Sequence, residues 1–180
     1  MLEINVRPPM YDPEAVQPMR DELIYVGFEE LTTPQKVDEV LSLKDDKTSI
    51  VFINSVCGCA AGSARPGVTL ALQNNIIPDR AVTVFAGQDR DAVDQVRNNY
   101  LKGFPPSSPY MAIIKNGEIV FTMPRHHIEG RTAEEISEIL ISEFKNHCNA
   151  KGPSISQDAY SKLVHARACG SKIPLNEVKN

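Results

Sequence analysis

Two cysteines separated by a single glycine are the residues of this chain with the clearest chemical potential. Cys57, Gly58 and Cys59 follow the apolar, β-branched run from Thr48 to Asn54 and precede a stretch with helical character. A thiol at the start of a helix lies near the positive end of the helix dipole and near unpaired N–H donors, which favour the thiolate. The position therefore predicts a reactive thiol at the carboxyl end of a buried strand, where open α/β folds place reactive groups.

The spacing of the pair limits its chemistry. Two extended residues span at most about 7 Å between Cα atoms, whereas a disulfide needs roughly 4.4–6.8 Å. The pair can close only where the backbone bends, which Gly58 permits, and the tight ring should be reduced more readily than a relaxed structural bridge. This favours thiol–disulfide exchange, in which Cys57 attacks and Cys59 resolves the mixed disulfide.

Two other interpretations of the cysteine pair stay open: a metal- or cluster-binding module and a buried structural pair. Zinc is disfavoured because no second cysteine pair follows at zinc-site spacing, although His126 and His127 could complete a site if the fold brings them close. Free cysteine also behaves as a small buried hydrophobe. The remaining cysteines, Cys148 and Cys169, lie far along the chain, and four cysteines are too few for a disulfide-built scaffold.

Composition excludes several classes of protein. The 180 residues are 42% hydrophobic and 23% charged, which predicts one globular domain with a real core. A net charge of −4 gives no basic footprint for nucleic acid. Apolar runs are too short for a membrane span, and the first residues lack the pattern of a signal peptide. We therefore expect a cytoplasmic protein without nucleic-acid or membrane partners.

Strand and helix signals alternate along the chain. The expected helices are Pro18 to Val26, one after the Thr33-Pro34 cap, one from the cysteine motif to about Gln73 with a break at Arg65-Pro66-Gly67, Asp89 to Leu101, and one capped by Thr132 with Glu135. The expected strands are Phe28 to Leu31, Thr48 to Asn54, Ala81 to Ala86, and the hairpin Tyr110 to Lys115 and Glu118 to Met123 around Asn116-Gly117.

This order predicts an α/β fold of the thioredoxin type. Strands alternating with helices require right-handed crossovers and a parallel core, to which the hairpin adds antiparallel strands. The expected architecture has three layers, with a mixed central sheet flanked by helices and an extra N-terminal helix.

Many ordered motifs resemble those of the bacilliredoxin family, thioredoxin-like proteins with a Cys-Gly-Cys site. They are Pro18-Met19-Arg20, Gly27 to Leu31, Asn54 to Gly62, Ala64-Arg65-Pro66, Val82 to Asp89, Pro105 to Pro109, Arg125-His126 and Ile128-Glu129-Gly130. The resemblance spans about residue 13 to Cys148. It departs at Ser63, where asparagine is expected, and at Tyr110, where serine is usual.

The resemblance implies a thiol–disulfide oxidoreductase that removes bacillithiol from S-bacillithiolated proteins, with weak disulfide isomerase activity. Cys57 then corresponds to the nucleophile and Cys59 to its resolving partner. No cofactor or metal is implied; the partners are S-thiolated proteins and bacillithiol, or a similar low-molecular-weight thiol, as co-substrate.

Three further residues are expected at the substrate-binding site. Proline before the first hairpin strand can be cis and then presents backbone groups to a substrate disulfide. Five residues separate Pro109 from Lys115 at the hairpin turn, which resembles the spacing of the thioredoxin cis-proline. Ser108 precedes that proline. Arg65 could support the thiolate if the following turn brings it round.

The chain is expected to divide near residue 149. Residues 1–148 form the thioredoxin-like bacilliredoxin domain, and residues 149–180 form a peripheral C-terminal extension with five basic and two acidic residues. Lys151-Gly152-Pro153-Ser154 has turn chemistry, and a short helix is expected from Gln157 to Ala168. The extension is predicted to be dispensable for the fold and for exchange.

Overall fold

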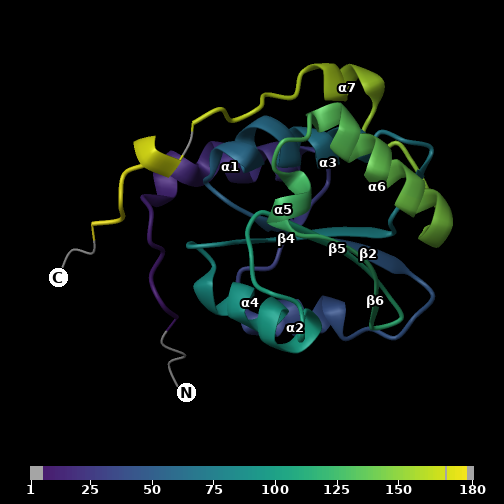
Figure 1. The fold of residues 1–180 in the computed structure, drawn as a ribbon, viewed down its shortest axis with the longest axis horizontal. Coiled ribbons are helices and arrows are strands. Elements are labelled where there is room, and N and C mark those ends of the chain that lie inside the picture. Colours follow the sequence, from purple (N-terminus) through teal and green to yellow (C-terminus); the bar gives the residue numbers. More distant parts are fainter. Residues whose placement is uncertain (1–5, 169, 178–180) are drawn as a thin grey trace.

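A five-stranded mixed sheet forms the centre of the molecule (Figure 1), confirming the predicted fold class. The computed structural model describes residues 6–168 and 170–177, so Cys169 lies outside the described residues. The strand order is β1–β4–β2–β5–β6; β1, β4 and β2 are parallel, whereas β5 and β6 form an antiparallel hairpin. The strands are β1 (Glu29–Glu30), β2 (Thr48–Asn54), β4 (Arg80–Phe85), β5 (Tyr110–Lys115) and β6 (Glu118–Met123).

The central strand β2 is buried along its whole length because helices cover both faces of the sheet. Its side chains alternate between two cores, with Ile50 and Phe52 in one and Val51 and Ile53 in the other. Figure 1 shows α1 (Pro13–Tyr25), α3 (Arg65–Ala71) and α6 (Ala133–His147) over one face, and α2 (Pro34–Leu41) and α4 (Arg90–Gln95) over the other. The double cover explains the continuous apolar run in the sequence.

Several predicted boundaries are confirmed. The strands of the hairpin have the expected bounds, and Asn116 and Gly117 both adopt positive φ angles of 53° and 76°, as the tight turn requires. Thr132 caps α6 through its side chain, and Glu135 completes the capping box.

Helix α1 is longer at its N-terminus than the sequence predicts. It begins at Pro13 rather than Pro18, because the side chain of Asp12 accepts a hydrogen bond from the Glu14 N–H and Pro13 occupies the first turn. Pro18 lies inside the helix. The Asp12-Pro13 pair is a helix-start signal of the same kind as Thr33-Pro34.

The helix after the cysteine motif and the helix of residues 90–100 each change type instead of breaking. A π-helical turn (Ala60–Ala64) precedes α3, and a second one (Val96–Tyr100) follows α4. Pro66 lies in the first turn of α3, where its missing N–H costs no helical hydrogen bond. The expected break at Arg65 is therefore a change of helical period.

Residues 149–168 and 170–177, called the tail below, pack along the domain. Strand β7 (Ala150–Lys151) pairs with β3 (Ile76–Ile77), and α7 (Gln157–Ser161) is shorter than the predicted helix. Gly152 approaches so closely that an added Cβ would lie 1.9 Å from the Asn74 carbonyl oxygen. Beyond α7, shown in yellow in Figure 1, the tail runs across to the start of α1, where Tyr11 and Leu175 form a β-bridge.

The tail thus packs against the domain through a strand pairing, a β-bridge and the close approach at Gly152. That the fold and the exchange reaction do not need the tail stays a prediction, which truncation would test. Within the described ranges, the helices are all too short or too polar to cross a membrane.

Candidate functional site

The cysteine pair lies where β2 ends and the helical segment begins. The Sγ atoms of Cys57 and Cys59 are 2.7 Å apart without a covalent bond, and both side chains are partly exposed. The backbone N–H of Ala60 points at the Cys57 sulfur from 3.4 Å, in the first turn of the helical segment. The strand, the turn and the helix start therefore bring both thiols to one accessible edge of the sheet.

The two thiols differ in acidity. Burial opposes ionisation of Cys57, but hydrogen bonds from Cys59, Ser55 and the Ala60 N–H, together with the charge of Arg125, outweigh burial and lower the pKa of Cys57. Burial and the hydrogen bond with Cys57 raise the pKa of Cys59 to about 11. Cys57 is therefore the thiol better able to act as a thiolate, which agrees with the order of roles predicted for the pair.

Arg125 is a charged neighbour of the two thiols that the sequence did not place at the site. It begins the short helix α5 (Arg125–Ile128), directly after β6, and its charge attracts both cysteine sulfurs. Its guanidinium donates hydrogen bonds to Glu129 and to the Ser108 carbonyl, and its backbone N–H donates to the Ser107 hydroxyl. The fold thus brings the charge of Arg125 close to the thiols.

The loop before β5 confirms the predicted cis bond between Ser108 and Pro109. Ile53 and Tyr110 are paired across β2 and β5, so Pro109 lies one step beyond this pair, next to the end of β2. The loop therefore borders the cysteine motif, and Pro109 itself is buried while Ser108 is partly exposed.

Arg65 is placed under the site rather than on its surface. Its side chain is fully buried, and its guanidinium donates to Glu22 at 2.9 Å, to Asn54 Oδ1 at 3.0 Å and to the Ser55 carbonyl at 2.9 Å. Its charge is also attracted to Cys57. The expectation that Arg65 contacts substrate is therefore corrected: as it lies here, Arg65 positions the loop that carries Cys57.

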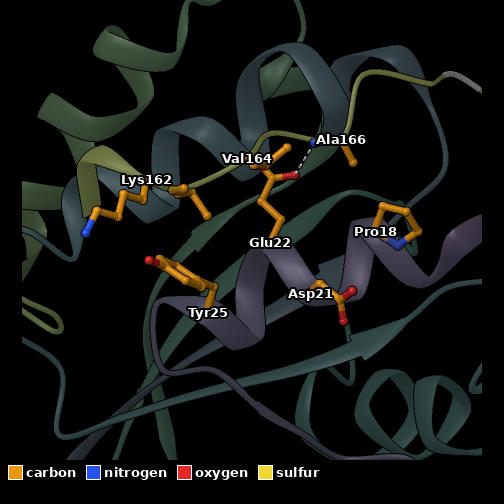
Figure 2. Close-up of a pocket in the computed structure, with 8 residues that line it drawn as sticks. Pro18, Asp21, Glu22, Tyr25, Lys162, Val164 and Ala166 are labelled. Carbon is orange, nitrogen blue, oxygen red and sulfur yellow. Dashed lines mark hydrogen bonds between the residues drawn. The ribbon is translucent and has the colours of Figure 1, made fainter. Parts of the chain in front are cut away.

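The tail completes this buried ionic cluster. The Glu22 side chain is also fully buried. Its carboxylate accepts a hydrogen bond from the Ala166 N–H, drawn as a dashed line in Figure 2, and lies 2.6 Å from Nδ1 of His165. Arg65 in turn donates to the Ala166 carbonyl at 3.1 Å. A cavity of about 270 Å³ lined by Pro18, Tyr25 and Val164 lies beside this contact, between the tail and α1 (Figure 2), and the cysteines are not among its lining residues.

The remaining metal and thiol candidates are placed apart from the pair. His126 and His127 are exposed on α5, and their rings meet edge to face with centroids 4.2 Å apart. In the part of the chain that the structure describes, three or more His, Cys, Asp or Glu side chains are nowhere grouped as metal ligands. Cys148 is buried at the end of α6, and burial raises the pKa of its thiol.

Comparison with known proteins identifies relatives for most of the chain. The family described as disulphide isomerase matches residues 11–148. A bacilliredoxin from Salinibacter ruber is 48% identical over 143 residues, which cover 79% of this chain and 83% of the relative. Bacilliredoxins from Geobacillus kaustophilus and Staphylococcus aureus are 47% and 44% identical, covering 77% and 79% of this chain and 94% and 96% of theirs. The family match ends at Cys148, before the tail.

Proposed function

The chain belongs to the bacilliredoxin family, and we propose that its Cys57–Cys59 pair removes a low-molecular-weight thiol from protein mixed disulfides. Family membership gives the chain a thiol–disulfide redox role. The observation that supports the finer statement is the asymmetry of the pair: two thiols in contact, one with a lowered pKa and one with a raised pKa.

The proposed reaction proceeds by two exchanges. The Cys57 thiolate attacks the sulfur of the small thiol in the mixed disulfide; a new disulfide forms between Cys57 and the small thiol, and the protein thiolate leaves and takes up a proton. Cys59 then loses its proton and attacks the Cys57 sulfur, so that a Cys57–Cys59 disulfide forms and the small thiol is released. Each exchange conserves one disulfide, and over both steps the enzyme cysteines supply the two electrons.

The lowered pKa of Cys57 suits the first exchange, because the attacking species is the thiolate. The raised pKa of Cys59 keeps this residue protonated and able to donate its S–H to the Cys57 thiolate until the mixed disulfide forms. Once Cys57 is bonded to the small thiol, that hydrogen bond is lost and one cause of the raised pKa of Cys59 disappears. The geometry thus favours attack before resolution.

We propose bacillithiol as the co-substrate and S-thiolated proteins as the partners, in the cytoplasm, with no cofactor; a dithiol or small-thiol reductant returns the enzyme to the dithiol state. Pro109 and Ser108 are proposed to face the substrate disulfide, and Arg125 to favour the Cys57 thiolate. Weak disulfide isomerase activity would use the same first exchange on a protein disulfide.

The test offers one model protein capped with bacillithiol, with glutathione or with coenzyme A to the intact enzyme and to the Cys59→Ala variant. We expect release of the cap in both, with bacillithiol fastest and the thiol recovered on Cys57 in the variant. A protein that releases none of these caps, or whose rate is unchanged by Cys57→Ala, would contradict the proposed function.

A further inference from the structure

A cavity of about 540 Å³ lies beside the cysteine pair, and the tail forms one of its walls. Gly58 and Gly62 of the cysteine motif line one side, Glu134 of α6 lines another, and His165 and Arg167 of the tail close it. Gly58 stands between the two reactive cysteines, so the cavity adjoins the place where a mixed disulfide would form. Its volume lies in the range of small-molecule sites, which are about 300–1,000 Å³.

The glycines leave room for a bound group next to the sulfurs. A Cβ added at Gly58 or at Gly62 would meet nothing within 4 Å. The space beside both glycines is therefore open, and it belongs to the cavity that adjoins the cysteine pair.

The cavity carries two unpaired charges of opposite sign. Among the described residues, nothing forms a hydrogen bond or an ion pair with the side chains of Arg167 and Glu134, both of which are exposed. Most other arginines of the structure are engaged: Arg7, Arg20, Arg65, Arg80 and Arg125 each pair with a carboxylate. A free guanidinium facing a cavity is a ready partner for a carboxylate, which it can bind through two parallel hydrogen bonds.

The wall that carries Arg167 is anchored by the buried ionic cluster. The two preceding residues, His165 and Ala166, are held by Glu22 and Arg65 through hydrogen bonds of 2.6–3.1 Å. The backbone leading to Arg167 is thus fixed in register with the cysteine motif, because Arg65 also binds the Ser55 carbonyl. Binding residues held by such a second layer lose less entropy when a ligand arrives.

We propose that this cavity binds the small-thiol half of the mixed disulfide, and that the thiol is built on an amino acid. Its carboxylate lies toward Arg167 and its ammonium group toward Glu134, while its sulfur is bonded to Cys57. The inference rests on the proposed function and names the class of thiol it accepts. Because Arg167 lies beyond the family match at residues 11–148, this part of the specificity belongs to the tail of this chain.

The test measures mixed-disulfide formation on Cys57 in the full-length Cys59→Ala protein, followed by mass. Three small symmetric disulfides serve as probes: cystine has both charges, 3,3′-dithiodipropionate has only carboxylates, and cystamine has only ammonium groups. Rates are compared for the parent, for Arg167→Ala, for Arg167→Lys and for Glu134→Gln. The matched control is Arg90→Ala, which removes the same charge from α4 on the opposite face of the sheet (Figure 1).

We expect Arg167→Ala to lower the rate of adduct formation with cystine and with dithiodipropionate by about three- to fivefold, which corresponds to the energy of an exposed ion pair. The rate with cystamine should stay unchanged. Arg167→Lys should keep most of the parent's rate with the two carboxylate probes. Glu134→Gln should lower the rates with cystine and cystamine but not the rate with dithiodipropionate. Arg90→Ala should not change the rate with any one probe relative to the other two.

Equal effects of Arg167→Ala on all three probes, or no effect on any, would overturn the proposed thiol class. If Cys57 forms adducts with this charge dependence but the intact enzyme releases no cap from protein, the proposed function fails while the cavity assignment stands. If no probe reacts with Cys57, both are overturned.

Discussion

Replacing Glu22 by glutamine is expected to be strongly destabilising, because it leaves a buried guanidinium without its carboxylate. The side chains of Glu22 and Arg65 are both fully buried, and Nε of Arg65 lies 2.9 Å from the Glu22 carboxylate. Removing one partner of such a pair costs about 3–5 kcal/mol, since the other charge stays in a low-dielectric interior. The substitution preserves shape, so the loss measures the charge and its hydrogen bonds rather than a cavity.

The loss is measured by urea unfolding followed by far-UV circular dichroism and by thermal midpoint. For a chain of this length about 1 kcal/mol corresponds to roughly 2–4 °C, so the midpoint should fall by about 6–20 °C. The control is Asp158→Asn, which removes the exposed pair between Asp158 and Lys162 and should cost no more than about 1 kcal/mol.

A second variant separates the ion pair from simple packing. Glu22→Leu combined with Arg65→Met removes both charges and should recover much of the stability lost by Glu22→Gln, since replacing a whole buried pair is often close to neutral. A loss below about 1 kcal/mol for Glu22→Gln, equal to that of the Asp158→Asn control, would refute the view that the cluster holds the loop and the tail together.

Three further predictions follow from the site and its support. In Cys59→Ala, and to a smaller extent in Arg125→Ala, the pH midpoint for alkylation of Cys57 should rise, because each change removes an interaction that lowers the pKa of Cys57; an unchanged midpoint would contradict this origin of the acidity. Gly67→Ala should cost about 1–3 kcal/mol in urea unfolding, because the added Cβ would lie 2.7 Å from a side-chain carbon of α6; a neutral result would mean that the two helices separate freely. Truncation after Cys148 should leave a folded domain, since the central sheet ends earlier, but should lower its stability by about 1–3 kcal/mol because buried charges lose tail partners; full stability would support the sequence-based expectation of a dispensable tail.

The strands and most helix caps could be predicted because their signals are local. The apolar run of β2, the Asn116-Gly117 turn and the Thr132 capping box each determine their geometry within a few residues. The position of the cysteine pair at the end of β2 follows from the same local order. These features needed no knowledge of contacts between distant segments.

The rest of the site depends on contacts across the chain, which local signals do not encode. Glu22 and Arg65 are 43 residues apart, and the tail reaches Glu22 from 143 residues away. The sequence places Arg65 at the substrate-binding site, but the side chain is buried because Glu22 and the tail supply partners for its charge. Arg125 likewise owes its place near the thiols to the sheet order, in which β6 pairs with β5 and β5 pairs with β2.

The most direct test of the central claim is which of the two cysteines captures the small thiol. Cys59→Ala and Cys57→Ala are each mixed with a bacillithiol-capped model protein, quenched with acid, and mapped by peptide mass. We predict that Cys59→Ala accumulates one bacillithiol on Cys57 and that Cys57→Ala accumulates none at comparable times. Capture on Cys59 in the Cys57→Ala variant at an equal rate, or capture at Cys148 in both, would contradict the assignment of Cys57 as the attacking thiol.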